Sequence, residues 1–182
     1  EGRPDESIFF VGNVMIDTMM KHRAAAMALP TLDKLGLKSP QGGRRDYAVL
    51  TLHRPANVDN REVLASLGEA LCTIGKQMPV VFPVHPRTRA RIQEFGLADV
   101  FSAQNGLSLV EPMGYLDFLN LTANARVVLT DSGGIQEETT ILGVACLTLR
   151  PNTERPITVT QGTSQLVGND TKAITEGFEN VV

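Results

Sequence analysis

The sequence contains no tryptophan, and aromatic residues make up only 5% of it. Proteins that bind single-stranded nucleic acid stack successive bases on aromatic rings, so this composition offers little for that role. Lysine and arginine number 17 against 20 aspartates and glutamates, which gives a formal net charge of -3. A domain that binds nucleic acid through its phosphates usually carries a basic face. We therefore expect no nucleic-acid partner.

Long apolar runs and a secretion signal are also absent. No stretch reaches the roughly 18 apolar residues that a membrane helix needs, so we expect no membrane partner. The two cysteines, Cys72 and Cys146, lie in apolar stretches without metal-binding spacing. They are typical of buried thiols in a cytoplasmic protein, and no metal site is expected. A length of 182 residues with 42% hydrophobic residues suits one globular domain over residues 1–182.

What the sequence does contain is short apolar runs that alternate with longer amphipathic segments. Strands are expected over 8–11, 47–52, 80–84, 107–110, 126–130, 144–149 and 166–167. Helices are expected over 14–29, 60–77, 88–95, 115–123, 135–142 and 172–181. This order predicts βαβ units, and the apolar strands lack strict alternation, as in a parallel sheet covered on both faces. The fold class is therefore α/β, with a Rossmann-like parallel sheet flanked by helices.

Polar groups follow the predicted strands at several places. In an open parallel sheet, ligands bind beyond the carboxyl ends of the strands. The groups that follow four of these strands are, in chain order, His53, Arg54 and Asn57; His85 and Arg87; Asp131, Ser132, Gly133 and Gly134; and Arg150, Glu154 and Arg155. Any one group could be accidental, but four together argue for a site that holds an anionic ligand.

The segment from Asp131 to Glu138 is the most informative of these. Gly133 and Gly134 would open a helix, where free amides and the positive helix end favour a phosphate. Glu138 comes about one turn later, and its side chain leans back toward the helix start, where a carboxylate suits the two hydroxyls of a sugar. The alternative is that Asp131 or Ser132 only caps the helix and that Glu138 is solvated.

The histidines and the other arginines are open to two interpretations. A lone histidine is more often a structural hydrogen-bonding group than a catalyst, but His53 directly follows a strand beside Arg54, which favours function. For His85 the two readings are balanced. The arginines after His85 fit a solvated helix face better than a phosphate patch, and the spacing of Phe118 is that of a core residue.

These segments resemble the non-hydrolysing UDP-N-acetylglucosamine 2-epimerases over nearly the whole chain. The matching segments, in the family's order, are Thr51-Leu52-His53-Arg54 with Asn57, Pro83-Val84-His85-Pro86, Thr130 to Glu138, and Thr153-Glu154-Arg155-Pro156 with Gly162-Thr163. The resemblance implies the C-terminal, UDP-binding half of a two-domain architecture like that of the GT-B glycosyltransferases. Ala56 departs from the pattern, because many members carry glutamate there, and the hydrogen bonding of that loop is left open.

The resemblance also implies roles for individual residues. It assigns the diphosphate to Ser132, Gly133 and Gly134, and the ribose hydroxyls to Glu138. Arg155 and the catalytic His53 would lie near the phosphates, and Phe118 and Met113 would border the uracil. Arg54 and His85 match positions that some bacterial members use for a second, regulatory UDP-N-acetylglucosamine.

The implied reaction interconverts UDP-N-acetylglucosamine and UDP-N-acetylmannosamine by elimination and re-addition of UDP, without a redox cofactor or an obligatory metal. The acidic residues that move the C2 proton belong to the family's first domain. We therefore expect that N-terminal domain as a missing partner, an inactive isolated chain, and a homodimer for the full-length enzyme. A non-catalytic UDP-binding module and a glycosyltransferase half-domain are the alternatives.

Overall fold

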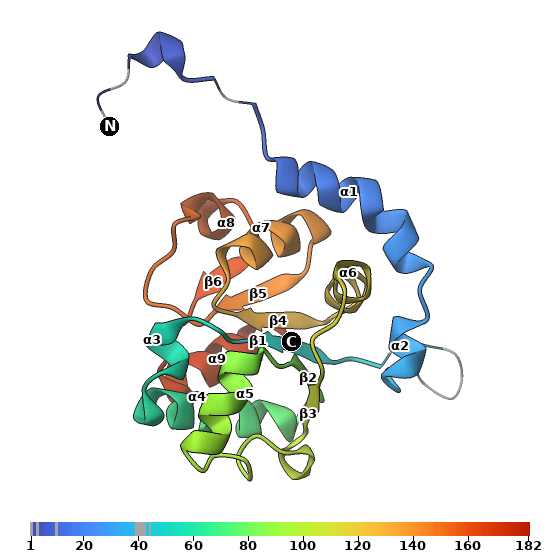
Figure 1. Cartoon of the computed structure of the whole chain (residues 1–182), viewed down its shortest axis with the longest axis vertical. Helices are drawn as coiled ribbons and strands as arrows, with labels where there is room; N and C mark the ends of the chain where they lie inside the picture. Colours follow the sequence, from blue (N-terminus) through green and yellow to red (C-terminus); the bar gives the residue numbers. More distant parts are fainter. Residues whose placement is uncertain (1, 3, 10, 39–42, 44) are drawn as a thin grey trace.

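The computed structural model describes residues 2, 4–9, 11–38, 43 and 45–182. Its centre is a parallel sheet with the strand order β3-β2-β1-β4-β5-β6. The strands are β1 (Ala48–Thr51), β2 (Val80–Pro83), β3 (Leu107–Val110), β4 (Val127–Thr130), β5 (Ala145–Thr148) and β6 (Ser164–Leu166). The predicted parallel α/β sheet is therefore confirmed, and Figure 1 shows it between two layers of helices.

The strands are buried on both faces, as their continuous apolar runs predict. Ala48 and Leu50 of β1 pack in the core that is covered by α4 (Arg61–Gly75), α5 (Pro86–Glu94) and α9 (Thr171–Val181). Val49 points to the other face, which α6 (Tyr115–Ala123) and α7 (Gly133–Leu142) cover. Outside this second layer, α1 (Val14–Met27) lies against α6 and α7 (Figure 1).

Short helices complete the fold and link its larger elements. They are η1 (Asp5–Ser7), α2 (Thr31–Lys34), α3 (Pro55–Val58), η2 (Ala103–Asn105) and α8 (Pro156–Thr160). Of these, α3 and α8 follow β1 and β5 and were not predicted, because four or five residues are too few for a clear amphipathic pattern. Within the described residues no helix is long and apolar enough to cross a membrane.

The strand predicted over residues 8–11 is wrong for the residues that the structure describes, and Phe10 lies outside them. Ile8, Phe9 and Val11 are exposed and belong to no strand. Figure 1 shows why, since the chain before α1 runs away from the sheet and meets no strand with which to pair. An apolar run forms a strand only where a neighbour can accept its backbone hydrogen bonds.

Several helix boundaries also differ from the prediction for local reasons. Helix α7 begins at Gly133 rather than at residue 135, although two glycines open it. Helix α5 begins at Pro86, whose missing N–H needs no partner in a first turn. The His85 side chain caps α5, because its Nδ1 accepts the backbone N–H of Arg87 at 3.2 Å. Capping of this kind is a structural role that the sequence did not reveal.

We expect Gly75→Ala to destabilise the fold. A Cβ at Gly75 would lie 2.0 Å from the backbone oxygen of Asn105, where η2 leads into β3. Since backbone must move to relieve this overlap, the free energy of unfolding should fall by about 2 to 3 kcal/mol. Gly114→Ala is the control, because no atom lies within 4 Å of its added Cβ. Equal unfolding free energies for the two variants in urea titrations would contradict the close approach.

Candidate functional site

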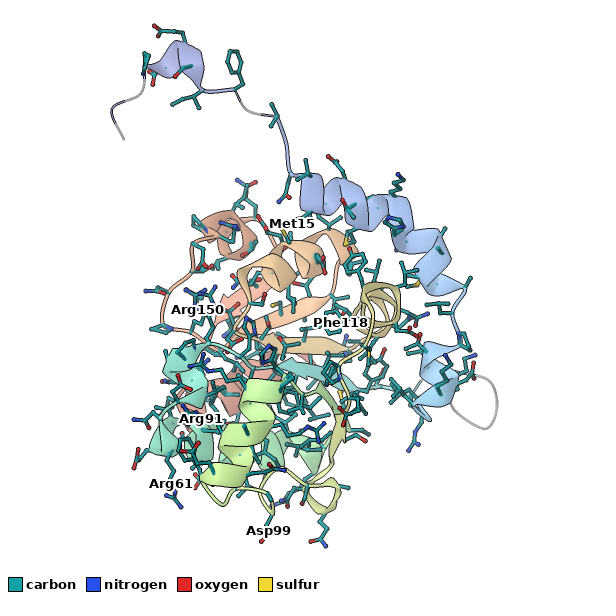
Figure 2. All side chains as sticks on the ribbon, in the orientation of Figure 1. Met15, Arg61, Arg91, Asp99, Phe118 and Arg150 are labelled. Carbon is teal, nitrogen blue, oxygen red and sulfur yellow. The ribbon has the colours of Figure 1, made fainter. Side chains whose placement is uncertain are left out.

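The parallel register brings the predicted site residues to one edge of the sheet. Thr51, Thr130 and Thr148 end their strands and are paired across β1, β4 and β5. The residues that follow these strands therefore start at the same level. His53, His85, Ser132 and Arg150 all lie just beyond the carboxyl ends of their strands, as predicted. Figure 2 shows their loops between α3, α5 and α7.

Asp131 organises this edge. Its carboxylate is fully buried and accepts the backbone N–H of His53 at 3.0 Å and that of Arg54 at 2.8 Å. The side-chain amide of Asn57 donates to the same carboxylate at 3.3 Å. Nδ1 of His53 lies 3.1 Å from the other carboxylate oxygen. One buried side chain after β4 thus holds the whole loop after β1, a role that the sequence reading missed.

These hydrogen bonds set the charge of Asp131. Burial alone raises the pKa of its carboxyl group, but the hydrogen bonds from the His53 side chain and from the backbone N–H groups of Arg54 and His53 outweigh it. The net pKa lies below the ordinary value, so the group is a carboxylate at neutral pH. Because the carboxylate engages Nδ1 of His53, Nε2 is the ring nitrogen that remains available to a ligand.

The start of α7, where the sequence predicts an anion site, has no side-chain cap. Ser132 is the N-cap residue of this ten-residue helix, and its side chain makes no capping hydrogen bond. The first backbone N–H groups of a helix have no partner within it, and the helix dipole is positive there. The alternative that Asp131 or Ser132 only caps the helix therefore does not hold. Asp131 is engaged with the loop after β1, and the Ser132 side chain makes no capping hydrogen bond.

Glu138 is buried rather than solvated, with 6% of its surface exposed. Burial raises the pKa of its carboxyl group, which is only partly offset by a hydrogen bond from the Tyr115 hydroxyl at 3.4 Å. Glu138, Tyr115, Val14, Met15 and Thr18 line a cavity of about 220 Å³ between α1, α6 and α7. A desolvated carboxylate in this position gains from hydroxyl donors that a ligand would bring.

A second cavity of about 230 Å³ lies beyond the ends of β1 and β2. His53, His85, Met113 and Phe118 all line it. The rings of His53 and His85 have centroids 6.2 Å apart. Phe118 is partly buried against the core, as its spacing predicts, and it also lines this cavity. The structure thus brings the residues suggested for uracil beside His53, while Glu138 lines the neighbouring cavity.

The arginines at the sheet edge and on α5 form ion pairs. Nε of Arg155 lies 3.0 Å from Glu137, and Glu154 accepts from both Arg54 at 2.9 Å and Arg150 at 2.6 Å. On α5 the arginines pair with acidic residues, as the solvated-face reading predicts. The pairs are Arg87 and Arg91 with Asp59, Arg89 with Glu111, and Arg91 also with Glu94.

Gln136 is a second organising residue that the sequence reading missed. It is fully buried in α7, and its Oε1 accepts the hydroxyl hydrogen of Thr153 at 2.7 Å. Its amide donates to the backbone oxygen of Ser132 at 3.2 Å. This side chain therefore fixes the loop before Arg155 against the start of α7. Across the part of the chain that the structure describes, no group of histidine, cysteine or acidic side chains could hold a metal ion.

Comparison with known proteins places this arrangement in context. A family model described as UDP-N-acetylglucosamine 2-epimerase matches residues 1–182. A UDP-N-acetylglucosamine 2-epimerase of Methanococcus maripaludis is 39% identical over 184 residues, which cover 100% of this chain and 50% of that protein. The chain thus spans about half the length of the curated relatives it matches.

Solved structures agree with this result. A crystal structure of the Methanocaldococcus jannaschii UDP-GlcNAc 2-epimerase, in complex with UDP-GlcNAc and UDP, superposes with a TM-score of 0.88 at 38% identity. The match covers 99% of this chain and 49% of that one. The E. coli heptosyltransferase WaaC matches 84% of this chain and 48% of its own with a TM-score of 0.54 at 15% identity, which shows a shared fold alone.

We expect Asp131→Asn to lower the free energy of unfolding by about 2 to 3 kcal/mol at pH 7, because an amide cannot accept all of these hydrogen bonds and lacks the charge that strengthens them. Asp99→Asn makes the same chemical change at an exposed position at the far end of the molecule (Figure 2). That control should change the unfolding free energy by less than about 0.5 kcal/mol.

The same pair of variants has a pH signature. The folded-state pKa of Asp131 lies below the ordinary value of 3.8, so its stabilisation is complete above that pH and is lost as the pH falls through the folded pKa. The difference in unfolding free energy between wild type and Asp131→Asn should therefore shrink below about pH 4. A difference that stays constant down to pH 3 would contradict the assigned role.

Proposed function

The chain belongs to the UDP-N-acetylglucosamine 2-epimerase family, and from this premise we propose that residues 1–182 form one nucleotide-sugar-binding domain that holds the UDP part of the substrate. The observation that carries the proposal is the open start of α7, with Gly133 beside Arg155 and with His53 held nearby by Asp131. The M. jannaschii relative, crystallised with UDP-GlcNAc and UDP, supports this choice of ligand.

The diphosphate takes the first-turn amides of α7. Its oxygens accept from the backbone N–H groups of Gly133 and Gly134, where the helix dipole favours a negative charge. Ser132 joins them when its N–H exchanges the hydrogen bond to Thr130 Oγ1, which is 3.0 Å long in the structure, for one to the ligand. Arg155 adds a cation from the loop that Gln136 fixes. Gly133 has no side chain in the way, so a phosphate oxygen can approach its backbone closely.

The position of the nucleoside follows from that of the diphosphate. Both ribose hydroxyls donate to Glu138, whose buried carboxylate accepts a long hydrogen bond from the Tyr115 hydroxyl. The uracil enters the cavity that Met113 and Phe118 line, where apolar side chains cover its faces. Binding therefore repays the desolvation of Glu138 with two hydroxyl hydrogen bonds.

The chemistry follows from where charge develops. When UDP leaves C1 of the sugar, negative charge gathers on the diphosphate, and preorganised amides and Arg155 stabilise it. His53 is the catalytic residue of this chain, because its free Nε2 can hold a proton at the departing phosphate oxygen while Asp131 fixes the ring. UDP then re-adds at C1 on the face that it left, while a proton returns to C2 on the opposite face, so that C2 alone is inverted.

Proton movement at C2 needs a further acid and base. The described acidic groups at this edge are already engaged: Asp131 by His53, Glu137 by Arg155, and Glu154 by Arg54 and Arg150. We assign the proton transfer to the half of the relatives' length that this chain does not span. A homodimer of the complete enzyme and a regulatory UDP-N-acetylglucosamine at Arg54 and His85 belong to the same proposal.

We expect Gly133→Val to weaken UDP binding by about 2 kcal/mol or more, because a branched side chain blocks the approach of the diphosphate and removes charge-assisted hydrogen bonds. Calorimetry with UDP measures this loss. The variant should keep its thermal unfolding transition, since even a Cβ at Gly133 meets no atom closer than 3.4 Å. Unchanged UDP affinity would rule out the start of α7 as the diphosphate site.

We expect the 182-residue chain alone to bind UDP weakly and not to convert UDP-N-acetylglucosamine to UDP-N-acetylmannosamine. A site open to water also screens the charges that assist catalysis. NMR of the C2 proton in deuterated water tests this, with a His53→Ala preparation to exclude a contaminating host epimerase. Silence with bound UDP fits either the incomplete epimerase or the non-catalytic binding module, and recovery of exchange on adding a family first domain separates them. Turnover by the chain alone would refute the assignment of the proton transfer.

A further inference from the structure

Two arginines at the carboxyl edge of the sheet share one carboxylate. Arg54, after β1, donates to Oε1 of Glu154 at 2.9 Å, and Arg150, after β5, donates to Oε2 at 2.6 Å. Glu154 therefore joins two loops that are about 100 residues apart in the sequence. Both cations are occupied in the structure, although each stands where an anionic ligand of the sheet edge would meet it.

Glu154 also lies against the start of α7. A Cβ built on Gly133 would be 3.4 Å from Oε1 of Glu154, which is ordinary contact distance. The carboxylate thus sits beside the first-turn backbone that the proposed function gives to the diphosphate. Its position and charge are those of an anion at this helix start, supplied by the chain itself.

Glu154 is charged at every pH at which the protein would work. A hydrogen bond from its own backbone N–H, and then those from Arg150 and Arg54, outweigh its partial burial and hold the pKa of Glu154 at about 2. Its side chain is nevertheless 44% exposed, so it can turn toward water without leaving a buried charge unpaired. The loop that carries it is anchored separately, because Thr153 is hydrogen-bonded to Gln136.

We propose that Glu154 is an internal anion that occupies Arg54 and Arg150 until the diphosphate of a nucleotide sugar replaces it, and that it thereby sets the affinity of the site for diphosphates. The inference rests on the proposed function, because it assumes that a diphosphate binds at the start of α7. A diphosphate carries more charge and more acceptor oxygens than one carboxylate, so it can take over both arginines when no regulatory ligand holds Arg54. A neutral nucleoside cannot, and it gains nothing from them.

In this arrangement the two arginines are available only to a ligand that displaces the Glu154 carboxylate. With Glu154 in place, a weakly charged ligand finds both arginines neutralised and binds through the nucleoside contacts alone. A diphosphate must displace the carboxylate, which lowers its affinity but allows the UDP-sugar product to leave after each turnover. Glu154 therefore moderates the affinity for UDP, and the two arginines that it releases account for the remaining preference for diphosphates over neutral nucleosides.

The test is calorimetric titration of wild type and Glu154→Gln with UDP, inorganic pyrophosphate and uridine. Glutamine keeps the size of the side chain and removes its charge, so Arg54 and Arg150 become available. The affinity for UDP and for pyrophosphate should rise about three- to tenfold, as expected for the loss of two partly exposed ion pairs. Uridine affinity should stay unchanged.

Glu94→Gln is the matched control. It removes the same charge from an ion pair with Arg91 at the far end of α5, away from the carboxyl edge. It should leave the UDP affinity within about twofold of wild type, because only long-range electrostatics change and salt screens them. An equal gain in Glu94→Gln would show that net charge, and not the position of Glu154, controls binding.

The outcomes separate the inference from the proposed function. If wild type binds UDP and Glu154→Gln binds it equally or more weakly, Glu154 only positions the arginines, and the inference is overturned while the proposed function stands. If the variant binds both phosphate ligands and wild type binds neither, the result supports the inference that Glu154 competes with the diphosphate for Arg54 and Arg150. If neither protein binds UDP or pyrophosphate, the proposed site and the inference both fail.

Discussion

The buried carboxylate of Asp131 is the constraint on which the site depends. A charged group without solvent is unfavourable unless hydrogen bonds replace its hydration, and this one is satisfied by backbone and side-chain donors of the β1 loop. The satisfaction is mutual, because the same donors would otherwise be buried without partners. The loops after β1 and β4 are therefore locked together, and the orientation of His53 follows from that lock.

Around this fixed centre the remaining charges are exchangeable. The pairs of Glu154 with Arg54 and Arg150 are partly exposed, as is Arg155 beside Glu137. Ion pairs of this kind contribute little to stability, so a ligand can replace them at small cost. The edge thus combines one buried polar network with an outer set of partly exposed charges, which suits the proposed exchange of an internal ion pair for a bound diphosphate.

Apolar side chains are also exposed outside the sheet. Ile8, Phe9, Val11 and Val14 are exposed ahead of and at the start of α1, and Ile141 and Ile157 are exposed on α7 and α8. Of these, Ile141 and Ile157 line a cavity with Glu137, and Val14 lines the cavity that contains Glu138. In relatives of twice this length, such exposed side chains would be available for contact with the remainder of the chain.

The sequence by itself determined the parallel α/β fold, because continuous apolar strands such as Val80 to Val84 can be satisfied only in a sheet covered on both faces. It also determined which loops carry the site, since residues that follow parallel strands must share an edge. The start of α7 was readable for the same local reason, from Gly133 and Gly134.

Only the tertiary structure decided how the polar residues pair. Asp131 could be read locally as a helix cap, yet it binds a loop about 78 residues away, and the polar Gln136 is fully buried. The apolar run at Ile8 was predicted as a strand, but no strand of the sheet lies beside its described residues. Periodicity records which side of an element is apolar, whereas hydrogen-bond partners depend on which distant segments the fold brings within 3 Å, and that distance exists only after the sheet has formed.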